Sequence, residues 1–247
     1  LTRATLQTSL VAVGIASLAG FLLTFLPDPR LGLEPPATVI SAVRTVSQPL
    51  AALLNDHKVQ LQQSRLQTQA PPAPRPGELE AFRSGLDQLR AYLNGDSAAL
   101  DRVAERLAAA RYRIEWVEQR YLYLREEEPV RGWGVYVLDT RVTGNLLVEV
   151  PAPLDEQGAF TAGGWLFDIL GARALAVAGA PRTINPDGSL DVLRNRQTLF
   201  HVFHQVMARR DVLQVRTYTA RSSQELAGIP ADAFRTGTVL PPTALWV

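Results

Sequence analysis

Residues 6–26, LQTSLVAVGIASLAGFLLTFL, form a mostly apolar run that contains no charged side chain. At a helical rise of about 1.5 Å per residue, a run of this length crosses the ~30 Å hydrocarbon core of a bilayer. Backbone polar groups in lipid must bond within their own segment, so a helix is the expected conformation. We therefore predict a single transmembrane helix that makes residues 1–30 an N-terminal anchor, with a long buried core helix as the alternative.

The flanking residues indicate how this anchor is used. The sequence PDPR at 27–30 offers no A-x-A-like cleavage site, which favours an uncleaved signal-anchor. Arg3 and Arg30 nearly balance the positive charge on the two sides. Because a short tail ahead of a first span usually stays inside, we expect a single-pass protein of the inner (cytoplasmic) membrane with its C-terminal domain on the periplasmic side. The chain opens at Leu1, so we also expect residues to precede it.

Charge and cysteine content exclude several function classes. The 25 basic and 24 acidic residues give a net charge of +1 and are interspersed, so no nucleic-acid surface is predicted. The sequence has no cysteine, which excludes a cysteine nucleophile and any disulfide. The lone lysine, Lys58, lies outside any G-x-x-x-x-G-K-[ST] phosphate loop. No small-molecule substrate is indicated.

Two apolar patterns near the N-terminus predict packing on partners in the membrane. Small residues every four positions along the span allow close approach of another transmembrane helix. An alternation of three and four over 37–69 predicts an amphipathic helix, kinked or divided at Pro49, that forms a stalk over residues 31–77 with its Pro-rich linker at 70–77. The interface residues predicted from these two patterns are Ala12, Ala16, Gly20, Val39, Val43, Val46, Leu50 and Leu53.

Residues 78–128 are predicted to form an antiparallel helical hairpin. One apolar stripe runs over 78–93 and ends at Asn94-Gly95. A second stripe continues with three and four spacing to about Leu124, before Glu128-Pro129. The short turn between them makes the two helices neighbours with coiled-coil-like packing.

Residues 129–247 change to a β-rich pattern that predicts a small α/β domain. Strands at 133–138 and 146–150, joined through Thr143-Gly144-Asn145, are expected to pair as an antiparallel edge hairpin. A helix at 160–170, a strand at 174–178, a helix at 196–209 and a strand at 212–219 predict a mostly parallel sheet. The tail from 228 to 247 is expected to be irregular.

Ligands of a parallel sheet bind beyond the carboxyl ends of its strands, which here are residues 151–157 and 179–188. A zinc site would use His201 and His204, three apart on one helix, with Asp191. The alternative is that one histidine packs and the other faces solvent. The polar residues expected near this edge are Glu149, Asp155, Glu156, Arg182, Asn185, Asp187 and Asp191.

The run at 146–182, LLVEVPAPLDEQGAFTAGGWLFDILGARALAVAGAPR, resembles the first βαβ unit of zinc-dependent amidohydrolases of the phosphorylase/hydrolase-like fold, the N-formylglutamate and poly-γ-glutamate hydrolases. The resemblance implies a histidine ligand in the loop after the strand. That loop here is Pro151-Ala152-Pro153, and the second loop is Gly179-Ala180-Pro181-Arg182. The resemblance therefore implies a copy that has lost its metal and become a binding or structural domain.

These observations favour a non-catalytic accessory subunit that packs against transmembrane subunits of a larger membrane complex, with the lipid bilayer as its other partner and no cofactor. One alternative is an exported, membrane-tethered zinc hydrolase of an envelope polymer. Another is a self-associating coiled-coil stalk or sensor over residues 37–124.

Overall fold

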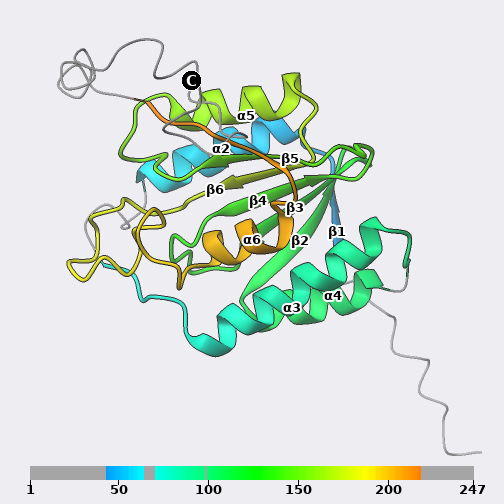
Figure 1. Cartoon of the computed structure of the whole chain (residues 1–247), viewed down its shortest axis with the longest axis horizontal. Helices are drawn as coiled ribbons and strands as arrows, with labels where there is room; N and C mark the ends of the chain where they lie inside the picture. The colour runs from blue at the N-terminus through cyan, green and yellow to red at the C-terminus, as the bar shows by residue number, and fades with distance from the viewer. Residues whose placement is uncertain (1–42, 64–69, 98, 218–247) are drawn as a thin grey trace, which may run out of the picture. The chain divides into compact units, whose positions relative to one another are not determined.

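A computed structural model describes residues 43–63, 70–97 and 99–217 (Figure 1). Within these ranges no helix has the length and hydrophobicity that crossing a bilayer requires. The helices are α2 (Leu50–Gln63), α3 (Pro76–Leu93), α4 (Ala99–Ala109), α5 (Ala159–Ile169) and α6 (Leu199–Met207). The strands are β1 (Val43–Val46), β2 (Tyr112–Val117), β3 (Tyr121–Glu126), β4 (Val135–Asp139), β5 (Leu146–Val150), β6 (Ala174–Val177) and β7 (Asp211–Gln214).

The described strands form one seven-stranded mixed sheet in the order β1-β2-β3-β4-β6-β5-β7. Strands β2, β3, β4 and β6 pair antiparallel in succession. Strand β5 pairs parallel with both β6 and β7, and β1 pairs parallel with β2. The predicted α/β class is confirmed. The sheet is mixed because the antiparallel strands β2, β3, β4 and β6 adjoin the parallel strands β5 and β7.

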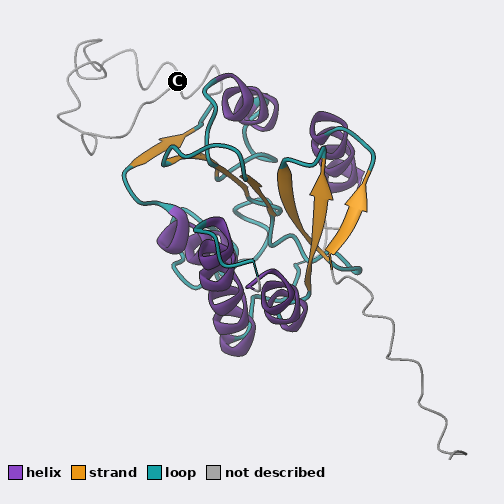
Figure 2. Cartoon of the chain, turned by 90° about the vertical axis from the view of Figure 1, so that its right-hand side faces the viewer, coloured by secondary structure: helices purple, strands orange, loops and turns teal. Residues whose placement is uncertain are grey.

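Helices cover both faces of this sheet (Figures 1 and 2). Alternate residues of the central strands belong to two separate cores, as the two-residue period of a strand requires. Tyr136 and Leu138 pack with α3, α4 and α6. Val135 and Val137 pack with α2 and α5 on the other face. The near-continuous apolar runs of β4 to β6 therefore reflect burial on both sides.

The alternation β5-α5-β6-α6-β7 confirms the sequence prediction for residues 146–214. Gly163 explains how closely α5 approaches the sheet, because a Cβ at this position would lie 2.2 Å from Val150 Cγ2. The glycine thus lets a short helix pack directly on strand β5.

The helix predicted up to Leu124 is wrong beyond Ala109. Residues 112–126 form the antiparallel strands β2 and β3. Between them, Glu118 and Gln119 have φ of 52° and 50°, and Arg120 N–H donates to Val117 O at 3.0 Å. Two successive positive φ angles make the type I′ turn that suits a hairpin. The usual Asn-Gly signal is absent, and the apolar spacing also fitted a helix.

The predicted edge hairpin of 133–138 with 146–150 is also wrong. Strand β6 lies between β4 and β5, pairing antiparallel with β4 and parallel with β5. The turn residues at 143–145 therefore lie in a connection that passes over a neighbouring strand. In place of the predicted pair, the described hairpins are β2-β3 and β3-β4.

In the described part of the helix predicted over 37–69, residues 43–46 form a strand. Val43 and Val46 lie in β1, which pairs with β2, and each packs partly buried against a different core. Leu50 and Leu53 lie in α2 with 6% and 7% of their surface exposed. The apolar stripe read as an unpartnered stalk is therefore, in the described part, an edge strand and a helix packed on the sheet.

The Pro-rich segment is held against the α/β unit by its carbonyls. Trp133 Nε1–H donates to Pro72 O at 3.0 Å, and Asn185 Nδ2 donates to Pro71 O at 3.0 Å. Helix α3 then begins at Pro76, where a missing N–H costs nothing. The predicted helical hairpin is confirmed for α3 and α4, which pack on each other.

Several predicted features lie outside the described residues. These are the apolar span at 6–26 with Ala12, Ala16 and Gly20, the stalk residue Val39, and the tail at 228–247.

Candidate functional site

A hydrogen bond joins the loops beyond the carboxyl ends of β5 and β6, and an ion pair fixes the second loop. Arg182 donates its backbone N–H to Asp155 Oδ2 at 3.0 Å. Its guanidinium donates to both oxygens of Asp191, at 3.1 and 3.2 Å. Burial alone would raise the pKa of Asp191, but the hydrogen bonds from Arg182 and from Leu193 N–H hold it below its usual range. The structure thus brings the predicted residues together in a contact that fixes loops.

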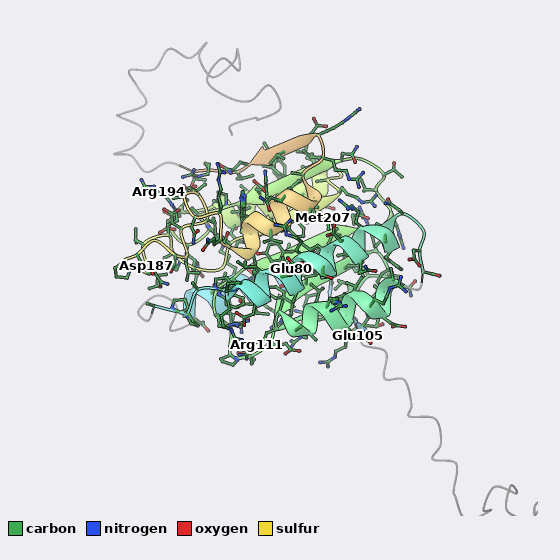
Figure 3. The ribbon with its side chains drawn as sticks, turned by 60° about the horizontal axis from the view of Figure 1, so that its bottom comes forward. Glu80, Glu105, Arg111, Asp187, Arg194 and Met207 are labelled. Atoms are coloured by element: carbon green, nitrogen blue, oxygen red, sulfur yellow. The ribbon has the colours of Figure 1, made fainter. Side chains whose placement is uncertain are left out.

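The other polar residues predicted at this edge also fix the loops to one another. Glu156 accepts from Arg216 Nε at 2.7 Å and from Thr217 N–H at 2.9 Å, which joins the loop after β5 to the segment after β7. Asn185 Nδ2 also donates to Ser189 Oγ at 2.6 Å. Figure 3 places Asp187 in these loops, where its Oδ1 accepts from Ser189 N–H at 2.9 Å. These side chains are already engaged.

Glu149 and His204 form the arrangement closest to a catalytic one. Glu149 in β5 is 2% exposed, and its Oε1 lies 2.7 Å from His204 Nδ1 on α6. This hydrogen bond raises the pKa of His204, whereas burial and the charge of His204 lower the pKa of His201. A buried carboxylate that orients an imidazole is one part of a general-base site. The neighbour of His204 is the His201 ring, stacked at 5.9 Å between centroids.

The predicted metal set is not assembled. His201 and His204 lie together on α6, but Asp191 is bound to Arg182 in the preceding loop. Across 43–63, 70–97 and 99–217, no group of three or more His, Asp or Glu side chains is arranged to hold a metal ion. In this structure Glu149 and His204 therefore form a hydrogen-bonded contact between β5 and α6.

Replacing Glu149 by Gln tests this contact. An amide removes the negative charge that holds the proton on the imidazole, so we expect the pKa of His204 to fall. Titration of the imidazole signals by NMR measures the change, with Gln205→Ala as a control on the same helix. A His204 pKa that is the same in both variants would contradict the pairing seen here.

A cavity of about 580 Å³ lies between α2 and α5. Its two helices are linked by Lys58, whose Nζ donates to Thr161 Oγ1 at 3.1 Å, and they approach closely where Gly164 faces Leu54. The walls are mostly apolar and the charged groups lie among them. The lining residues are Pro49, Leu50, Ala51, Leu54, Asn55, Lys58, Glu118, Arg120, Tyr121, Phe160, Thr161, Gly164, Trp165, Phe167 and Asp168.

The helix beside this cavity exposes large apolar side chains. Trp165 is 62% exposed, and Ile169, one turn further along α5, is 58% exposed. Leu170 follows at 49%, and Val59 on α2 is 39% exposed. These four residues, together with the cavity that Trp165 lines, are called the α2–α5 face below. Trp and large aliphatic side chains around a pocket are typical of the centre of a protein–protein interface.

Sequence reasoning found helix α5 but not its exposed face. The signal was present, because residues 159–170 carry one charged side chain, Asp168, and are apolar on every side of the helix. A helix that lies on one sheet can bury only one side. Its remaining apolar residues therefore either meet another partner or stay exposed.

Comparison of the chain with protein-family models, with curated proteins and with solved structures finds no match.

Proposed function

We propose that this chain is a non-catalytic accessory subunit, anchored in the inner membrane by residues 6–26, that binds a partner protein of the same membrane through the α2–α5 face. The observation that carries the proposal is the exposure of Trp165 and Ile169 beside a 580 Å³ cavity. Exposed apolar residues that gather around a cavity, instead of lying singly, mark interaction sites.

The composition of this face supports a protein partner. Apolar anchors of the kind seen here dominate binding energy when a partner removes them from water. Lys58 provides a cation at the cavity, and Glu118 and Asp168 provide anions, so the rim can pair with charges of either sign, while Arg120 is ion-paired with Asp139. An anionic lipid surface would instead favour a uniformly basic rim.

The position of the anchor in the chain is compatible with this partner. If residues 6–26 lie in the bilayer, residues 27–42 extend for at most ~55 Å before β1. The α/β unit is then confined near the membrane, where the effective concentration of another membrane protein is high. We place the domain on the periplasmic side, as the sequence predicts.

Exchange of Trp165 and Ile169 for Ser tests the proposal. Both side chains are largely exposed, so the variant should keep its fold while losing the apolar anchors of the face. We expect a partner that co-purifies with the full chain from mildly solubilised native membranes to be lost at least tenfold, because two interface anchors contribute about 2 kcal/mol or more. Quantitative mass spectrometry measures the loss.

The matched control changes Glu105 and Ala109 to Ser on α4, one helical turn apart and on the opposite layer. Both are exposed, and Figure 3 labels Glu105 on that side of the unit. This control should retain the partner. A chain that purifies without any stoichiometric partner, or one whose partner is unaffected by the α5 changes, would contradict the proposal.

A further inference from the structure

A second cavity, of about 280 Å³, lies on the other side of α2 from the α2–α5 face. At ~30 Å³ for each water in the liquid, it has room for a ligand the size of about nine waters. The two cavities lie on different sides of α2. Leu54 and Lys58 line the larger one, and Leu53 and His57 line this one. Its lining residues are Gln48, Leu53, Asp56, His57, Gln60 and Arg125.

Arg125 brings a positive charge to this cavity. It lies in β3, in register with Arg113 of β2. The Arg113 side chain donates to Glu115 at 3.0 Å, but the guanidinium of Arg125 makes no hydrogen bond or ion pair with any residue of the described ranges. A half-buried guanidinium holds five N–H donors, so an unpaired one is a strong binding group for a planar anion.

His57 also lines this cavity, and its ring carries a buried polar atom without a partner. His57 is only 6% exposed, and its Nε2 is buried without a hydrogen-bond partner. Leaving a buried polar group unpaired costs about 1–3 kcal/mol, so such a group calls for an explanation. Burial and the nearby charge of Arg125 lower the pKa of His57 to about 4, which keeps the ring neutral and able to donate one N–H.

The two glutamines are already engaged at the rim. Gln48 Nε2 donates to Asp56 Oδ2 at 2.6 Å, and Gln60 Nε2 donates to Glu128 Oε1 at 3.0 Å. Asp56 is exposed and carries the one acidic group of the lining. Its negative charge disfavours a dianion such as phosphate or a dicarboxylate. One cation, one neutral imidazole and one rim acid together match a ligand with a single carboxylate.

We propose that the cavity between α2 and β3 binds a small monocarboxylate, which is held by the guanidinium of Arg125 beside the imidazole of His57. The carboxylate comes either from a free organic acid or from the C-terminus of a peptide. This site is separate from the α2–α5 face and does not depend on the function proposed for it.

The test uses the full chain in detergent and two pairs of matched ligands. Propionate is compared with propionamide, and acetyl-Ala-Ala with its C-terminal amide, so that each pair differs only at the carboxylate group. Isothermal titration calorimetry measures affinity, and NMR signals of His57 report its environment. We expect saturable binding of at least one carboxylate and of neither amide, and the tighter of the two carboxylates identifies the source.

Arg125→Gln should weaken binding about tenfold or more, because a charge-assisted bidentate contact is lost. Arg125→Lys keeps the charge but not the planar fork and should give an intermediate loss. Lys58→Gln is the matched control, since it removes a cation that faces the other cavity. Absence of carboxylate binding at tens of millimolar, or equal affinity in folded Arg125→Gln and wild-type protein, would overturn the proposal.

Discussion

Replacing Glu126 by Ala should lower the free energy of unfolding by about 4 kcal/mol, since about 1–3 kcal/mol is lost for each buried polar group left unpaired. Glu126 is 3% exposed and ends strand β3. Its Oε2 accepts the N–H groups of Arg131 at 2.7 Å and Gly132 at 3.0 Å, and its Oε1 accepts that of Trp133 at 2.9 Å. Alanine leaves three buried donors without an acceptor.

The neighbouring contacts explain why this loss should spread. Arg131 donates to Glu78 Oε1 of α3 at 3.0 Å, and its guanidinium stacks 3.3 Å from the centroid of the Trp133 ring. Trp133 in turn holds the carbonyl of Pro72. Loss of the Glu126 anchor therefore loosens the start of α3 and the Pro-rich segment together with the β3-β4 connection.

Denaturant unfolding at pH 8 measures this effect, with Glu126→Gln as the matched variant. Burial raises the pKa of Glu126 to about 7, despite the lowering by the backbone hydrogen bonds from Arg131 and Trp133, so pH 8 compares each variant with the charged form. Gln keeps one acceptor oxygen and the side-chain volume, and should lose about half as much stability. An Ala variant within about 1 kcal/mol of wild type would mean that water reaches the three N–H groups.

The sequence predicted the half of the fold in which local pattern and tertiary packing agree. Strands β5 and β6 are apolar throughout and alternate with helices, and a buried parallel arrangement is the common solution for such a pattern. Helix α3 was found because Asn94-Gly95 marks its end. At these positions the local sequence itself marks where a helix or strand ends.

The other half depended on information that no short window contains. Ile114, Val117, Tyr121 and Leu124 fit both a helical stripe and two strands, and the turn between the strands uses Glu118-Gln119 at positive φ. The insertion of β6 between β4 and β5 pairs residues about forty positions apart. Strand order of this kind is decided by which faces can be buried together, so the 143–145 turn signal alone could not reveal it.

The candidate sites divide in the same way. Motif reasoning located the polar residues at the ends of β5 and β6, and the structure places them in hydrogen bonds and ion pairs that fix loops. The α2–α5 face could have been inferred from the apolar content of residues 159–170. The cavity of Arg125 and His57 could not, because it joins a helix to a strand more than sixty residues away.

Replacing His57 by Leu should make the protein markedly less sensitive to mild acid. The pKa of His57 in the folded chain is about 4, below the ordinary value of 6.5. The unfolded chain therefore binds a proton between pH 6.5 and 4 that the folded chain does not, so His57 reduces stability as the pH falls through this window. At 1.36 kcal/mol per pKa unit, the loss is about 2 kcal/mol between pH 7 and 5, and about 3 kcal/mol by pH 4.

Glu126 acts with the opposite sign over nearly the same range, because its folded pKa of about 7 is above the ordinary value of 4.5. The folded chain retains a proton that the unfolded chain has released, so Glu126 favours the folded state as the pH falls. The two groups partly cancel in the wild-type curve, and the difference between His57→Leu and wild-type free energies isolates His57.

We expect this difference to be about 1 kcal/mol in favour of Leu at pH 7, where an unpaired Nε2 has been removed, and to grow by about 2 kcal/mol at pH 5. Urea unfolding at the two pH values measures it. A difference that does not grow would mean that His57 titrates normally in the folded chain. A variant more stable than wild type but deficient in carboxylate binding would show that His57 is retained at a cost in stability for the sake of its cavity.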